Sequence, residues 1–162
     1  MDADADERRA DNDRKIARDV EAYGCHVISV FDPEETHPPF SYSVGIQATS
    51  QAPEAIVIGL SSQLGHAMIN EYNTRVRQRV EFRRGIQYTG FLEGFGIYVE
   101  PTRSDRLSEY TLGCTRYYKG SPYAVVQLIY PTTSGLWPWQ TQAPERYKAN
   151  QPMLGRKHPQ RR

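Results

Sequence analysis

The segment at residues 54–60, EAIVIGL, limits the choice of fold more than any other part of the chain. It is almost continuously apolar, which is typical of a strand that other elements cover on both faces. The segment SSQLGHAMINEYNTRVRQR follows directly and predicts a helix with an apolar stripe, which Ser61 or Ser62 can cap. With 162 residues, the chain is long enough for one domain built around such a strand and short for two.

A second segment, PPFSYSVGI at residues 38–46, alternates large apolar residues with small or polar ones and predicts a half-buried strand. Ser41, Ser43 and Gly45 share one face of it. That face is either ordinary solvent-facing sheet or the wall of a site. Because small residues leave room above the strand, the pattern favours a cleft wall, and we name Tyr42 and Ser43 as candidate ligand contacts.

The rest of the pattern predicts a helix at 13–23 capped by Asn12, a short helix from Ser104, and strands at 25–31, 80–82, 86–92, 95–100 and 123–130. Several connections are hairpin-like and only one is a long crossover. We therefore expect an α+β domain whose six- or seven-stranded, mostly antiparallel sheet curls toward a split β-barrel, with two or three flanking helices. The expected boundaries are a disordered arm at 1–11, the globular domain at 12–154 and a basic tail at 155–162.

Composition excludes several classes of partner. Basic and acidic residues nearly balance, 20 against 19, so no overall field favours a nucleic acid or an anionic membrane. No apolar run approaches the ~20 residues of a membrane-spanning helix. Neither the two cysteines, Cys25 and Cys114, nor the four histidines have metal-ligand spacing, so we expect no metal site and a reduced, cytoplasmic protein.

The helix that starts at Ser61 and Ser62 offers the clearest candidate for ligand binding. Unpaired N–H groups and the helix dipole at such a start suit a phosphate or carboxylate, and His66, one turn further, can add a donor. Ordinary capping is the favoured alternative. His37, in a proline-bounded loop, is the best candidate for acid–base chemistry.

The segment GLWPWQ places two tryptophan rings, Trp137 and Trp139, on either side of a proline. Structural closure of one end of the sheet is the favoured interpretation. The alternative is a wall that stacks on a ligand or binds a partner, because aromatic rings with a polar edge suit both roles.

Four segments, PPFSYSVGI, PEAIVIGL, VQLIYPTTSGLWPW and QPML, together resemble a bacterial family catalogued as domain of unknown function family 4262. The resemblance spans roughly residues 12–154 and implies no chemistry, because no activity is assigned to that family. Its third segment usually has an acidic residue after the proline, where this chain has Thr132.

The order of the elements also resembles the flavin-binding split β-barrel, which implies a flavin phosphate such as that of FMN held by Ser61, Ser62 and one of Arg75 or Arg77. Two functions follow from the sequence. The first is a domain that binds a phosphorylated or flavin-like small molecule, with an oxidoreductase as one version. The second is a non-catalytic interaction module, such as an immunity or accessory protein. A homodimer is compatible with both.

Overall fold

The structure, a computed structural model, describes residues 2–107 and 109–155. Its helices are α1 (Ala3–Tyr23), α2 (Ile46–Ser50), α3 (Ser62–Arg77), α4 (Leu112–Tyr117) and α5 (Glu145–Asn150), with a 3₁₀ helix η1 at Ser104–Arg106. Its strands are β1 (His26–Val30), β2 (Phe40–Val44), β3 (Glu54–Ile58), β4 (Gln87–Leu92), β5 (Phe95–Pro101) and β6 (Val125–Ile129). Within these ranges no helix is both long enough and apolar enough to cross a bilayer. Apart from Gly155, the predicted basic tail lies outside the described residues.

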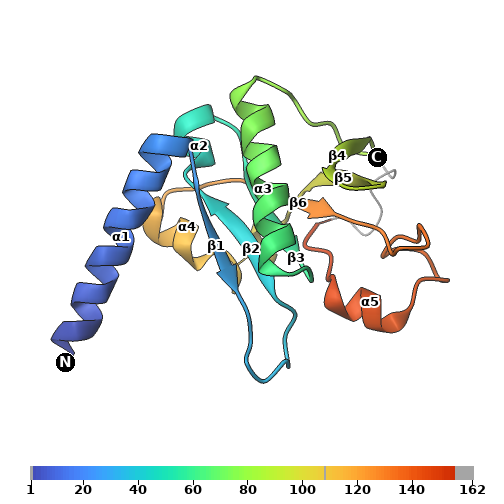
Figure 1. The fold of residues 1–162 in the computed structure, drawn as a ribbon, viewed down its shortest axis with the longest axis horizontal. Coiled ribbons are helices and arrows are strands. Elements are labelled where there is room, and N and C mark those ends of the chain that lie inside the picture. The colour runs from blue at the N-terminus through green and yellow to red at the C-terminus, as the bar shows by residue number, and fades with distance from the viewer. Residues whose placement is uncertain (1, 108, 156–162) are drawn as a thin grey trace.

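The six strands form one sheet in the order β1-β2-β3-β6-β5-β4, with β3 near the centre as predicted (Figure 1). Strand β3 pairs with β6 in parallel, and the other four pairings of the described strands are antiparallel. Strands β1 and β4 stand at opposite ends of this order, so the sheet is open. The α+β class and the mostly antiparallel sheet with flanking helices are confirmed.

Both faces of the sheet are covered. Helix α3 packs on one face with Ala55 and Val57 of β3, and α1 and α4 pack on the other face with Ile56 and Ile58 (Figure 1). Alternate side chains of a strand point to opposite faces, so β3 contributes to both cores. This two-sided burial explains why the segment EAIVIGL is apolar at nearly every position.

The small residues of β2 lie beneath α3, so the cleft wall favoured by the sequence is wrong. Ser41 and Ser43 are buried, and Gly65 of α3 lies directly over Ser41. A Cβ atom at Gly65 would stand 2.5 Å from Ser41 Oγ and 3.3 Å from a methyl group of Val57. Small groups on the strand and a glycine on the helix therefore let α3 approach the sheet closely, and the room between them is filled.

Helix α1 begins at Ala3, so the helix start predicted near residue 13 is wrong and residues 3–11 are helical. The Asp2 carboxylate accepts a hydrogen bond from the Asp4 N–H (3.1 Å) and caps the helix. The buried residues of α1 are Ile16 and Val20. The charged N-terminal half of α1 is thus helical because of its cap and its local helix propensity, without core packing. The sequence analysis expected a disordered arm there because the segment is polar.

Other elements also differ from the sequence prediction: the helix expected from Ser104 is a 3₁₀ turn, η1, with α4 following separately. The predicted strand at 80–82 is wrong, because these residues lie in no strand. The apolar character of Phe82 serves ring packing instead: its centroid lies 5.2 Å from that of Tyr72 and 4.8 Å from that of Tyr88. Helices α2 and α5 were not predicted. Each is only one to two turns long and lacks an apolar stripe, so periodicity gives no signal for it.

We expect Gly65→Ala to lower the free energy of unfolding by about 1–3 kcal/mol, although alanine is the better helix former. The reason is overpacking against Ser41, whose Oγ is the nearest atom to the added methyl group. Urea denaturation of the single variant and of the double variant Ser41→Ala/Gly65→Ala measures this effect. The double variant should recover part of the loss. A Gly65→Ala protein that is as stable as the wild type would contradict the close approach.

Candidate functional site

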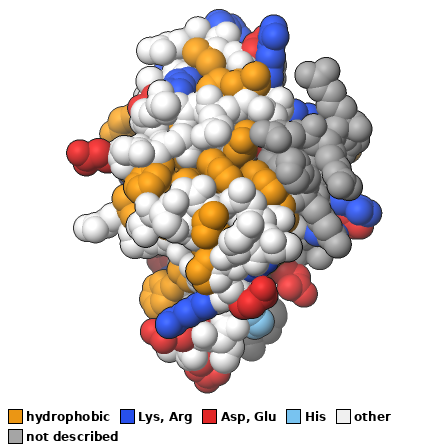
Figure 2. Space-filling view, turned by 90° about the vertical axis from the view of Figure 1, so that its right-hand side faces the viewer, with side chains coloured by type: hydrophobic (Ala, Val, Ile, Leu, Met, Phe, Trp, Pro, Cys, Tyr) orange, Lys and Arg blue, Asp and Glu red, His pale blue; other side chains and the backbone are white. Residues whose placement is uncertain are grey.

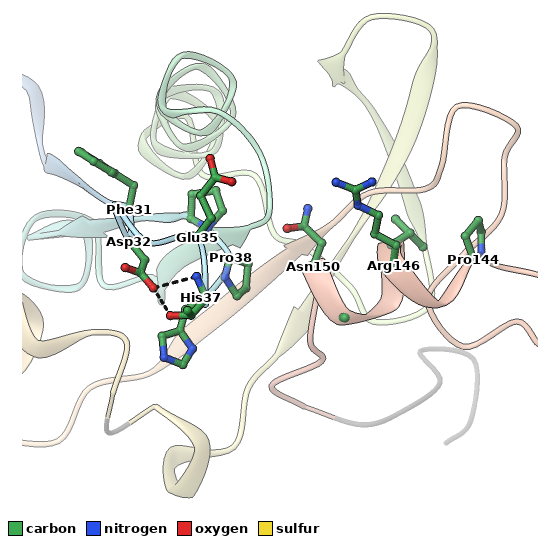
Figure 3. A pocket seen from close by; sticks show the side chains of 12 residues that line it. Phe31, Asp32, Glu35, His37, Pro38, Pro144, Arg146 and Asn150 are labelled. Atoms are coloured by element: carbon green, nitrogen blue, oxygen red, sulfur yellow. Dashed lines mark hydrogen bonds between the residues drawn. The ribbon is translucent and has the colours of Figure 1, made fainter.

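The structure contains a pocket of about 800 Å³ between the β1–β2 loop and helix α5 (Figure 3). Residues 31–39 form one wall and residues 144–150 form most of the other. The walls are far apart in the sequence and meet where β2 begins and where β3 and β6 end. The lining combines apolar groups, among them Pro38, Pro39 and Pro144, with charged and amide side chains.

Hydrogen bonds fix the α5 wall to the sheet. Tyr147 donates its hydroxyl to the backbone carbonyl of Tyr130, and Tyr130 in turn donates its own hydroxyl to the carbonyl of Ile58 (2.7 Å). Asn150 Nδ2 donates to the carbonyl of Gly59 (2.9 Å). Burial raises the pKa of both tyrosines, so their hydroxyls remain protonated donors. A six-residue helix with little core contact of its own is thereby held in place.

The β1–β2 wall is fixed by Asp32. Its carboxylate accepts hydrogen bonds from the backbone N–H groups of Glu34 and Thr36, both at 3.0 Å, and from the Thr36 hydroxyl. The hydrogen bond from Thr36 lowers the pKa of Asp32. Within this turn Glu35 adopts a left-handed backbone conformation with φ 56°, which is unfavourable for a residue with a side chain.

Gly59 joins the two walls. Its N–H donates to the carbonyl of Pro39 in the loop (2.7 Å), while its carbonyl accepts the hydrogen bond from Asn150. A Cβ atom here would stand 2.3 Å from the Tyr130 hydroxyl and 2.5 Å from the Asn150 carbonyl, and φ is +97°. Glycine is therefore the residue that lets α5 and the loop both close on the end of β3.

The charged side chains of the pocket come from both walls. In Figure 3, Glu35 from the loop and Arg146 and Asn150 from α5 point to the same side of the pocket, whereas the ring of His37 points to the other. Figure 2 shows acidic and basic side chains close together at the lower end of the face that it presents, below a band of hydrophobic side chains. The pocket lining itself includes charges of both signs, Asp32 and Glu35 on the loop and Arg146 on α5, beside apolar residues.

A second cluster surrounds the fully buried carboxylate of Glu54. Five groups donate hydrogen bonds to it: the Ser43 hydroxyl at 2.7 Å, the Tyr118 hydroxyl, and the backbone N–H groups of Gly45, Ile46 and Gln47, each at 3.1 Å. Both hydroxyls are oriented as donors, because Ala55 N–H donates to the Ser43 oxygen (2.9 Å) and Ala48 N–H to the Tyr118 oxygen (3.3 Å).

This arrangement makes Glu54 a structural carboxylate. A carboxylate offers about four lone-pair positions, and five donors leave none for a substrate. Burial raises the pKa of Glu54, and the hydrogen bonds from Tyr118, Ser43 and the backbone oppose that effect. The sequence analysis missed this residue, although an acidic side chain that opens an otherwise apolar strand is a signal for a buried, fully paired charge.

The residues predicted to hold a ligand do not gather at one place. Ser61 caps α3 by accepting from Leu64 N–H (3.2 Å), and Ser62 and His66 are exposed on the same helix. Tyr42 is buried and accepts from Gly113 N–H (2.9 Å), with its pKa raised to about 12 by burial. Ser43 serves Glu54, as described above.

Arg75 and the two tryptophans also have partners elsewhere in the fold. The Arg75 guanidinium lies over the ring of Phe91 at 4.3 Å and donates to the Thr89 carbonyl (2.6 Å). Trp137 and Trp139 stack on each other at 5.4 Å, and both rings contact Tyr98 edge to face. Of the predicted site residues, His37 is the one that lines the pocket.

The cysteines have no nucleophilic context. Both are buried, and burial raises the pKa of Cys25 to about 12 and also raises the pKa of Cys114. No group of three or more potential metal ligands occurs among the described residues.

The fold and its site define a class: an α+β fold with an open six-stranded mixed sheet and a pocket at one end of it. The family model described as Domain of unknown function (DUF4262) matches residues 19–144, and the chain belongs to this family. The match confirms the resemblance of the sequence motifs. No curated protein and no solved structure matches the chain.

The effect of Glu54 on stability should depend on pH. Because burial raises its pKa above the ordinary 4.5, the folded chain binds this proton more readily than the unfolded chain. The contribution of Glu54 to the free energy of unfolding is then fully present below pH 4.5 and falls as the pH rises through the folded-state pKa.

The variant Glu54→Gln isolates this contribution. At acidic pH we expect it to be about 1–3 kcal/mol less stable than the wild type, since its NH₂ group faces N–H donors. The difference should narrow as the pH rises, and denaturant titrations of both proteins at several pH values measure it. A difference that widens with pH would show that the hydrogen bonds outweigh burial.

Proposed function

We propose that this protein is a small-molecule-binding domain and that its site is the pocket between the β1–β2 loop and α5. The pocket itself carries the proposal. Its volume of about 800 Å³ falls within the range of sites that enclose small organic ligands. Its lining combines apolar residues with an equal number of polar or charged ones, and such sites use apolar surface together with polar groups that orient the ligand.

The rigidity of the walls supports this proposal. Asp32 fixes the loop, Tyr147 and Asn150 fix α5, and Gly59 bonds to both walls. A pocket held in this way loses little conformational entropy when a ligand enters, which favours affinity. His37 at the pocket is available for acid–base chemistry, and its catalytic role stays a prediction.

The other functional predictions are related to this site as follows. A phosphorylated or flavin-like ligand at Ser61 and Ser62 stays a prediction, as does an oxidoreductase activity. For such a ligand the pocket offers a cation in Arg146, a residue that the sequence analysis did not select. The interaction module, a cytoplasmic location and a homodimer also stay predictions. The packing of Trp137 and Trp139 on Tyr98 favours their structural role.

The variant Ala149→Trp tests the site by filling it. Ala149 lines the pocket and is exposed, so the indole occupies ligand space without disturbing the core. Ala67→Trp, at an exposed position of α3 outside the pocket lining, is the matched control. A fragment and metabolite library is screened by thermal shift on the wild type, and each ligand is then titrated on both variants.

We expect ligands that stabilise the wild type to lose that effect in Ala149→Trp and to keep it in Ala67→Trp. At about 100 times its Kd, a ligand adds ~2.7 kcal/mol of stability, which raises the Tm by several degrees. A library without any stabilising compound, or ligands that stabilise Ala149→Trp as strongly as the wild type, would overturn the proposed function.

A further inference from the structure

The side chains of Glu35 and Arg146 are charges of opposite sign on opposite walls of the pocket. Within residues 2–107 and 109–155, neither side chain makes a hydrogen bond, and the two side chains do not form an ion pair with each other. Both nevertheless point to the same side of the pocket (Figure 3). The other charged residues near them are already engaged: Asp32 accepts from its own loop, and Lys148 lies 3.6 Å from Glu145.

The backbone at Glu35 adds an independent observation. Its φ of 56° belongs to the left-handed region, where glycine or asparagine is the usual residue. The turn that Asp32 organises holds it there, with Glu35 N–H donating to the Asp32 carbonyl (3.0 Å). Gln51, Arg79 and Lys119 also have positive φ, but of these four residues Glu35 is the one in the pocket lining. Unfavourable conformations that the surrounding structure holds in place recur at ligand-binding sites.

We infer that the ligand of this pocket is a small zwitterion of the amino-acid or dipeptide class, with its ammonium group at Glu35 and its carboxylate at Arg146. This inference rests on the proposed function and specifies its ligand. In a molecule that carries both charges, the ammonium group pairs with the Glu35 carboxylate and the carboxylate pairs with the Arg146 guanidinium. A guanidinium binds a carboxylate with two parallel hydrogen bonds. Pro38, which lies between the two charged side chains in Figure 3, and Tyr147 of the same lining offer an apolar surface for the body of the ligand.

The carboxamide of Asn150 also points to this side of the pocket, but its NH₂ group is bonded to Gly59. That bond uses one of the two N–H donors of the amide, so its second N–H and its oxygen both remain for a ligand. The oxygen can accept a hydrogen bond from an ammonium or amide N–H. This polarity fits the nitrogen of an amino acid or the peptide N–H of a dipeptide. A ligand with two anionic groups would instead meet the Glu35 carboxylate with the wrong sign.

A mutant cycle across the ligand tests the assignment. The probes are phenylalanine and glycyl-phenylalanine, each also in its N-acetylated and its C-amidated form, which lack one of the two charges. Their Kd values are measured by calorimetry on the wild type and on the variants Glu35→Gln and Arg146→Gln. The matched controls are Glu34→Gln and Lys148→Gln, neighbours of the same charge that do not line the pocket.

On the wild type and the controls, we expect removal of either charge to weaken binding about fivefold, as for a solvent-accessible ion pair. In Glu35→Gln, acetylation of the probe's amino group should not change the Kd any further. In Arg146→Gln, amidation of the probe's carboxylate should not change the Kd any further. Comparison of phenylalanine with glycyl-phenylalanine shows which charge separation fits the pocket.

Each other outcome is decisive. If capped probes bind the wild type as tightly as zwitterions, the inference is wrong and the proposed function stands. The same conclusion follows if the zwitterions fail to bind while neutral compounds from the library bind in the pocket. If the effect of each cap persists in the variant that lacks its partner, the charges lie elsewhere and the inference is also wrong. If no compound binds the pocket at all, the proposed function is wrong as well.

Discussion

The hydrogen bonds around Glu54 connect more of this fold than any other interaction described. One carboxylate at the start of β3 accepts from Ser43 on β2, from three backbone N–H groups at the turn into α2, and from Tyr118 at the end of α4. The central strand, its neighbour and two helices are thus joined at a single buried charge. Such a group is costly to bury and is tolerated only when every acceptor position is used.

Much of the fold could be predicted from the sequence, because it depends on local patterns. The buried character of β3, the long helix α3 and the β4–β5 hairpin each have their own periodicity. The elements that were missed depend on contacts that periodicity does not record. Helix α5 is held by hydrogen bonds to Tyr130 and Gly59, both distant in the sequence, and no apolar stripe marks it.

The candidate site was harder to predict for the same reason. His37 was selected because prolines enclose its loop, and it does line the pocket. Arg146 was not selected, because nothing in its own segment distinguishes it from other surface arginines and only the docking of α5 places it opposite Glu35. The choice of Ser41 and Ser43 as a cleft wall failed for a different reason. A face of small side chains accommodates either a ligand or a closely packed helix, and Gly65, the residue that decides between them, lies in another element.

The parallel pairing of β3 with β6 has a consequence for how the chain reaches this fold. Strand β3 is complete early in synthesis, but the strand that covers its second edge comes only after α3, the β4–β5 hairpin and α4. Until β6 emerges, this fully buried strand has one row of backbone groups without partners, which is a template for pairing with another chain. Contacts between segments so far apart also form slowly. The interval between the synthesis of β3 and that of β6 is therefore the period in which a nascent chain is most prone to aggregate.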